Sequence, residues 1–208
     1  MAAPRAAYAP AEVLHIPRDK LDIDAKRIGR GAFGDVFHAV WRGTDHVAVK
    51  KLHGHLDERA LQEFQREVSF LHTLPYHPNV LQIHGVCVDE EHGAYLMVTE
   101  WMAGGSVFSF LASRAGQALP LTRRVAMCIQ AAMGIRHLHD SSPPVLHRDI
   151  KSLNFLMDAH GNVKVGMCAI PNPTAKRARG CVCACVCVGF HHCIVVSFSI
   201  LHSHLHLH

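Results

Sequence analysis

Three side chains that lie close together in the sequence suit phosphoryl transfer. Asp149 can accept a proton from an attacking hydroxyl, Lys151 can hold a phosphoryl group by its charge, and Asn154 offers an amide oxygen to Mg²⁺. A phosphoryl-transfer site needs these three roles, because its catalysis consists mostly of positioning and charge neutralisation. The stretch from His147 to Asn154 therefore predicts a catalytic loop.

A glycine-rich stretch near the N-terminus suits the phosphates of a nucleotide. Gly29, Gly31 and Gly34 have the spacing G-x-G-x-x-G, and glycine lets backbone amides approach phosphates without a clash. A dinucleotide site requires a helix to begin at the third glycine. Residues 36–50 instead form two apolar, β-prone runs around a turn. The pattern predicts a hairpin that covers phosphates, with the charge of Lys50 directed at them.

Five motifs in order resemble the catalytic domain of protein kinases, over residues 21–165. Besides the glycine-rich hairpin and Lys50, they include a helical pattern followed by His-Pro-Asn at 77–79 and a hinge-like stretch at 99–106. The loop at 147–154 reads H-R-D-x-K-x-x-N. Its Lys-Ser pair is the serine/threonine form, so the chain resembles the tyrosine-kinase-like group of serine/threonine kinases.

The resemblance implies ATP and Mg²⁺ as cofactors and a protein hydroxyl as acceptor. It makes Glu67 the ion-pair partner of Lys50, although base rates alone would favour a solvated helix charge. It assigns backbone contacts with adenine to Glu100 and Met102. The back pocket of the adenine site is assigned to Thr99, its floor to Leu156, and the metal ligand to Asn154. The implied catalytic residues are Asp149, Lys151 and Asn154, and the implied nucleotide-binding residues are Ile28, Gly29, Gly31, Gly34, Val36, Ala48, Lys50, Glu67, Thr99, Glu100, Met102 and Leu156.

The composition limits the class of protein. With 208 residues, 49% hydrophobic and 18% charged, the chain has the composition of a folded protein. A net charge of +4 without a long basic run gives no reason to expect a nucleic-acid partner. Five of the eight cysteines fall within 181–193, which is not a disulfide framework for the whole chain, and residues 1–17 lack the apolar segment of a secretory signal. We therefore expect a cytoplasmic protein with a loose, flexible leader over 1–20.

The hydrophobic pattern predicts an α+β, protein-kinase-like fold. We expect a five-stranded antiparallel N-lobe with one helix over 21–99, a hinge over 100–105 and a truncated helical C-lobe over 106–165. The expected helices cover 57–74, 106–112 and 121–139, and the later strands cover 80–88, 94–99, 155–157 and 162–165. The apolar positions of the third helix, which predict its buried face, are Val125, Cys128, Ile129, Ala132, Ile135 and Leu138.

From Gly166 onward the sequence departs from the kinase pattern. In kinases, a strand such as that at 162–165 leads within two residues into Asp-Phe-Gly, whose Asp chelates Mg²⁺. Here Gly166-Met167-Cys168 follows, and no Asp or Glu occurs from Gly166 to the last residue. The pattern leaves three hypotheses open: an impaired serine/threonine kinase, a non-catalytic nucleotide-binding or interaction module, and a retained-intron product without stable function.

The tail over 166–208 has low complexity. Cys alternates with Val and Ala over 181–188, a run that a TG/GT dinucleotide repeat can encode, and the codon of Val165 begins with GT as a splice donor does. A membrane span over 181–201 would carry two histidines in its middle, which is costly in lipid. A zinc site lacks the usual C-x₂-C spacing. We expect an unstructured, β-prone segment.

Overall fold

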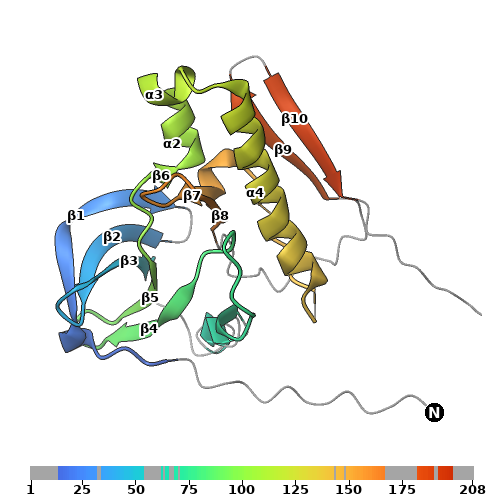
Figure 1. Ribbon diagram of the computed structural model, residues 1–208. Coiled ribbons are helices and arrows are strands. Elements are labelled where there is room, and N and C mark those ends of the chain that lie inside the picture. Colours follow the sequence, from blue (N-terminus) through green and yellow to red (C-terminus); the bar gives the residue numbers. More distant parts are fainter. Residues whose placement is uncertain are drawn as a thin grey trace, which may run out of the picture. The chain divides into compact units, whose positions relative to one another are not determined.

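The computed structural model describes residues 14–31, 34–53, 62, 64, 65, 68, 69, 71–142, 144–147, 149–166, 182–189 and 192–198. The chain forms two compact units, one up to Met102 and one that begins at Ala103 (Figure 1). The boundary between them falls within the segment 100–105, where the sequence predicts a hinge.

A five-stranded antiparallel sheet forms the N-terminal unit. Its strands are β1 (Leu21–Gly31), β2 (Gly34–Trp41), β3 (Asp45–Leu52), β4 (Ile83–Asp89) and β5 (Ala94–Glu100), in the spatial order β1-β2-β3-β5-β4. Apolar residues alternate along the strands, so that one face is buried. The core on that face consists of Ile16, Leu21, Ala39, Trp41, Val47, Val49, Cys87, Ala94, Leu96 and Val98. The expected five-stranded N-lobe is confirmed.

The helix expected over 57–74 is helical at the positions that the structure describes between 62 and 72. Two of its apolar side chains, Phe64 and Val68, are buried. At its end, Nδ1 of His72 lies 3.1 Å from the carbonyl oxygen of Ile83, the first residue of β4. This contact joins the helix to the sheet.

Strand β4 begins three residues later than the hydrophobic run predicts, at Ile83 rather than at Val80. The amide of Val80 donates to the His77 carbonyl at 3.1 Å and closes a turn. Pro78 is the second residue of that turn, a position that its fixed φ favours. Hydrophobicity alone does not reveal this boundary.

Residues 14–20, which we call the N-terminal strap, pack onto the sheet before β1. The amide of Ile16 donates to the Val86 carbonyl at 2.8 Å, and the amide of Val86 donates to the Leu14 carbonyl at 3.1 Å. These bonds add a parallel bridge to the outer edge of β4. Gly85 permits the close approach, because a Cβ there would collide with the Leu14 carbonyl oxygen. The expectation of a loose leader over 1–20 is therefore wrong for the strap.

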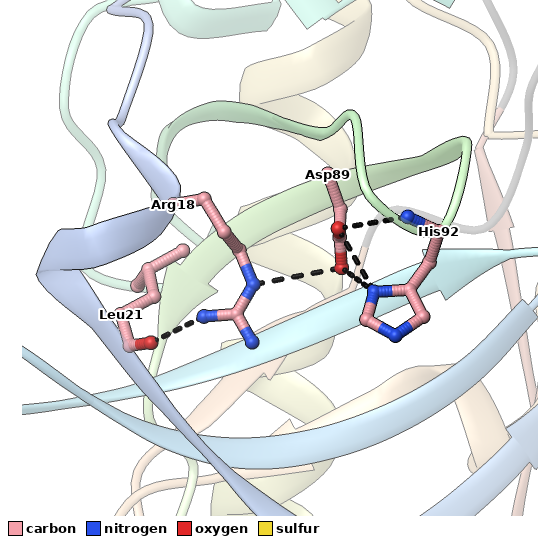
Figure 2. Close-up of polar contacts among 4 residues, drawn as sticks. All are labelled: Arg18, Leu21, Asp89 and His92. Carbon is pink, nitrogen blue, oxygen red and sulfur yellow. Dashed lines mark hydrogen bonds and ion pairs between the residues drawn. The ribbon is translucent and has the colours of Figure 1, made fainter.

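An ion pair connects the strap to the last residue of β4, and His92, in the turn that follows, contacts the same carboxylate (Figure 2). Arg18, in the 3₁₀ turn η1 (Arg18–Lys20), places Nε 3.5 Å from Asp89 Oδ2 and donates from Nη1 to the Leu21 carbonyl at 2.6 Å. The amide and Nδ1 of His92 lie 3.2 and 3.0 Å from Asp89 Oδ1. Burial alone would raise the pKa of the Asp89 carboxyl, but the bonds from His92 and the charge of Arg18 lower it below its ordinary value. The carboxylate therefore stays ionised and holds the strap.

The second unit combines helices with a small sheet. The hydroxyls of Ser106 and Ser113 accept backbone N–H groups three residues on, which caps α2 (Val107–Ala112) and α3 (Arg114–Gln117). The long helix α4 (Leu121–Asp140) follows. The sheet has the order β6 (Gly105–Ser106), β7 (Phe155–Met157), β8 (Val163–Val165), and the 3₁₀ turn η2 (Ser152–Asn154) precedes β7. The elements expected over 106–112, 121–139, 155–157 and 162–165 are present.

Three of the six positions that the sequence predicts for the buried face of α4 are buried, namely Cys128, Ile135 and Leu138. The buried residues of the helix are Met127, Cys128, Ala131, Gly134, Ile135 and Leu138. Val125 and Ile129, which the apolar pattern places inside, are 39% and 54% exposed. The side chain of Gln130 accepts a hydrogen bond from the Val163 amide at 2.8 Å, which joins the helix to β8. Because the sequence of α4 is apolar on two sides, its pattern does not predict which side packs against the neighbouring element.

The tail contains two antiparallel strands, β9 (Val182–Gly189) and β10 (His192–Phe198). The sequence predicts a β-prone but unstructured segment there, and the β-branched residues of both runs explain why they pair instead. In the part of the chain that the structure describes, no helix is both long and apolar enough to cross a membrane.

Replacing Ile16 by Ala should lower the free energy of unfolding of the N-terminal unit by about 2–4 kcal/mol, because a fully buried side chain would leave a cavity. The matched control is Leu14→Ala, whose side chain is 44% exposed and whose loss should cost less than about 0.5 kcal/mol. Urea denaturation followed by tryptophan fluorescence measures both. Equal losses in the two variants would contradict the packing role of Ile16.

Candidate functional site

One face of the N-terminal sheet carries residues that the sequence assigns to nucleotide binding. Val36 pairs with Lys50 across β2 and β3, and Ala48 pairs with Thr99 across β3 and β5. Paired residues of antiparallel strands point to the same face. These four residues therefore share the face opposite the apolar core. Glu67, the expected partner of Lys50, lies outside the described residues.

The glycine-rich hairpin forms where β1 meets β2. Gly29 pairs with Val36, and Gly31 pairs with Gly34. At Gly29 a Cβ would make an ordinary contact, 3.7 Å from the Cβ of Val36, whereas at Gly34 it would collide with the Lys51 carbonyl oxygen. The third glycine is therefore required by the close packing of β2 on β3. Ile28, assigned to the same site, is 50% exposed.

The segment at the end of β5 offers backbone groups, as the sequence predicts for a hinge. The amide of Glu100 donates to the Gln82 carbonyl at 3.1 Å, and its carboxylate accepts from the Gln82 amide at 2.8 Å. Any contact of Glu100 with adenine must therefore use its carbonyl oxygen. Thr99 is buried, and its hydroxyl donates to that carbonyl at 3.3 Å. Met102, the other predicted hinge contact, is also buried.

In the second unit, the three catalytic-loop side chains meet at one carboxylate. Lys151 Nζ lies 2.6 Å from Asp149 Oδ2. Asn154 Nδ2 donates to the same oxygen at 3.0 Å and to the Asp149 carbonyl at 2.6 Å. Because Nδ2 faces Asp149, Oδ1 is the atom of Asn154 that suits a cation. The structure therefore brings together the side chains of Asp149, Lys151 and Asn154, which the sequence predicts as one catalytic group.

The buried side chain of His147 ties this loop to the residue after β8. Its Nε2 lies 2.7 Å from the Gly166 carbonyl oxygen, and the Asp149 amide lies 3.4 Å from its Nδ1. Burial lowers the pKa of His147, although the bond to Gly166 opposes the shift. A neutral imidazole that donates from Nε2 and accepts at Nδ1 fits both contacts. The Gly166 amide donates back to the Asn154 carbonyl at 2.7 Å.

The role of His147 is the part of the site that sequence reasoning missed. The pattern H-R-D marks the residue, but its main partner is a backbone carbonyl 19 positions later, which has no side-chain signature. Arg148, between His147 and Asp149, lies outside the described residues. Leu156, expected at the adenine floor, is half-buried in β7, and its Cδ1 would lie 3.4 Å from a Cβ at Gly166.

The donor set for Mg²⁺ is incomplete. Asp149 and Asn154 supply oxygen atoms, but neither Gly166 nor Met167, the two residues after β8 in the sequence, carries a carboxylate. Across the described ranges, no group of three or more His, Cys, Asp or Glu side chains is arranged to hold a metal ion. Mg²⁺ prefers six oxygen ligands in octahedral geometry, and kinases bind two such ions. These residues do not fit that pair of ions.

A glycine-rich hairpin in an antiparallel sheet and a loop built around His-Arg-Asp together define the protein kinase class of fold. A family model described as "Protein tyrosine and serine/threonine kinase" matches residues 23–179. The chain belongs to this family. The match continues beyond Val165, where the motif resemblance ends.

Curated relatives of the chain are serine/threonine kinases. It is 42% identical over 155 residues to the probable serine/threonine-protein kinase drkA of Dictyostelium discoideum, an alignment that covers 71% of this chain and 23% of the relative. It is 36% identical over 143 residues to wall-associated receptor kinase-like 14 of Arabidopsis thaliana, covering 68% and 20%. The chain thus spans less than a quarter of the length of either relative.

His147→Gln should make the stability of the second unit less sensitive to pH. The folded-state pKa of His147 is lower than its unfolded value of about 6.5, so that the folded chain binds fewer protons and loses stability as the pH falls through and below about 6.5. Gln keeps a donor for Gly166 but does not titrate there. Urea denaturation at about pH 7.5 and 5.5 measures the slope, which is the change in the free energy of unfolding with pH.

The control for this experiment is His160→Gln, which removes an exposed histidine and leaves the buried one in place. His84 and His139, whose pKa values burial also lowers, remain in both variants. A slope in His147→Gln equal to that of the unchanged chain would contradict the role of burial at His147.

Proposed function

We propose that this chain is an ATP-binding protein of the serine/threonine kinase group with a low capacity for phosphoryl transfer. ATP binds on the face of Val36 and Ala48, with its phosphates under the glycine-rich hairpin and near Lys50. Asp149 is the base for a protein hydroxyl, and Lys151 balances the charge of the transferred group. The composition favours a cytoplasmic location.

The observation that supports low transfer is the sequence that follows β8. Kinases place their main Mg²⁺ carboxylate within two residues of this strand, where the chain has Gly166 and Met167, and neither side chain offers a carboxylate. Bridging cations neutralise charge on the transferred group and contribute several kcal/mol of transition-state stabilisation. At about 1.4 kcal/mol per tenfold in rate, the loss should slow transfer by at least about a hundredfold.

The alternative is a non-catalytic module that binds a nucleotide or a protein partner. The absence of any Asp or Glu from Gly166 onward favours it. The two functions differ in one measurable property. A slow kinase loses its residual transfer when Asp149 is replaced by Asn, whereas a non-catalytic module has none to lose.

Lys50→Ala should abolish the stabilisation of the chain by ATP. Saturating ATP should raise the melting temperature by about 3 °C or more, because it binds only the folded state. Lys51→Ala is the matched control, since Lys51 pairs with the core residue Leu96 and lies on the other face of β3. Thermal denaturation with and without ATP compares them. A shift that survives Lys50→Ala would contradict this binding face.

Met167→Asp should raise Mg²⁺-dependent transfer at least about tenfold, because it supplies a carboxylate where the kinase pattern has the Asp of Asp-Phe-Gly. Met167→Asn is the control of equal size without charge. Radiolabelled ATP and a generic basic protein substrate measure the transfer.

Two results would contradict the low-transfer proposal. One is equal activity in Met167→Asp and Met167→Asn. The other is robust transfer by the unchanged chain that disappears in Asp149→Asn, since this would show that the site works without the carboxylate.

A further inference from the structure

Two histidines on neighbouring strands of the N-terminal sheet contact each other through ring nitrogens. His38 Nε2 lies 2.8 Å from His46 Nδ1, and the rings stack with centroids 5.0 Å apart. On the other side of His38, Nδ1 lies 2.9 Å from Asp24 Oδ2. The ring of His38 also meets that of Trp101 edge-on at 4.7 Å. The proposed kinase function uses none of these side chains.

The strand register brings the three residues together. His46 pairs with Val40, two positions from His38 on the same face of the sheet. Opposite His38, β1 is irregular, because Ile23 pairs with Ala39 whereas the next pair is Arg27 with Phe37. Three residues of β1 therefore stand opposite one residue of β2, and such a bulge redirects side chains. Asp24 is the residue that it directs to His38.

The contact with Asp24 determines how His38 presents its other nitrogen. A carboxylate accepts a proton from Nδ1–H, so in the neutral ring the lone pair is on Nε2, the atom that faces His46. Metal-binding histidines characteristically donate their second ring N–H to a carboxylate in this way. Imidazole nitrogen is a ligand that suits Zn²⁺, Ni²⁺ and Cu²⁺.

The spacing of the two nitrogens is close to that of a pair bound to one ion. Zinc–nitrogen bonds of about 2.0–2.1 Å at a tetrahedral angle separate two ligand nitrogens by about 3.4 Å. The observed separation is 2.8 Å, so the rings need to move apart by about 0.6 Å. Solvent reaches the site, because His46 is exposed and the side chains of His38 and Asp24 are 18% and 55% exposed.

We infer that His38 and His46 form a two-histidine site for Zn²⁺ or a similar transition-metal cation, with Asp24 orienting His38. The ion takes the place of the proton that the two nitrogens share, and water completes its coordination. The described part of the chain supplies no third His, Cys, Asp or Glu ligand to this site. A bound ion would connect β2 to β3 beside Trp101.

The test uses Ni²⁺ as the probe and the fluorescence of Trp101 as the signal. A bound Ni²⁺ ion quenches a tryptophan within a few ångströms, and the ring of Trp101 lies 4.7 Å from that of His38. Variants of this site distinguish quenching by an ion bound here from any effect of Ni²⁺ bound to the histidines between His191 and His208. Titration of the full chain with NiCl₂ should give saturable quenching, which ZnCl₂ should reverse by competition.

His38→Asn and His46→Asn should each raise the Ni²⁺ concentration at half-maximal quenching at least about tenfold. Asp24→Asn should raise it about tenfold, since outer-sphere carboxylates typically contribute 10- to 100-fold to metal affinity. Trp101→Phe should remove the signal and leave that of Trp41. His15→Asn, at an exposed histidine outside the site, is the matched control and should behave as the unchanged chain.

Thermal denaturation without metal shows that each variant is folded before titration. Quenching that is unchanged in both histidine variants would overturn the inference, as would a signal that survives Trp101→Phe. Failure of ZnCl₂ to reverse the quenching in the unchanged chain would also overturn it. In each of these cases the three side chains form only a hydrogen-bonded connection between strands.

Discussion

A buried neutral imidazole needs a partner at each nitrogen, and this need organises the catalytic loop. An unpaired polar group in the interior costs about 1–3 kcal/mol, so His147 holds both the Gly166 carbonyl and the Asp149 amide in place. Gly166 in turn bonds to the Asn154 carbonyl. Buried hydrogen bonds therefore fix both ends of the loop, and Lys151 and Asn154 both contact the Asp149 carboxylate.

The loop retains the groups that move a proton but not the group that holds the cation. Hydrogen bonds within the second unit position Asp149, and they depend on the backbone of Gly166. The carboxylate that kinases use for Mg²⁺ can therefore be absent after β8 without disturbing the base. Structure and catalysis make different demands on the residues after β8, which explains how a family member can keep the fold of the loop and lose much of its chemistry.

Local patterns predicted the strands, the glycine-rich hairpin and the loop, because each depends on residues near one another in sequence. The remaining features depend on distant partners. Ile16 stands in a short mixed stretch near the exposed Leu14, and only the edge of β4 makes it part of the core. The exposed positions of Val125 and Ile129 depend on which neighbour covers α4. The contact between His38 and His46 depends on register, which no single strand encodes.

The N-terminal strap also determines where the folded domain begins. The family match starts at residue 23, after Ile16 and Arg18. A boundary drawn there would remove part of the hydrophobic core and uncover the backbone groups of β4 that pair with Leu14 and Ile16. An uncovered edge strand readily pairs with another chain, which leads to aggregation. The strap therefore keeps the sheets of separate molecules apart.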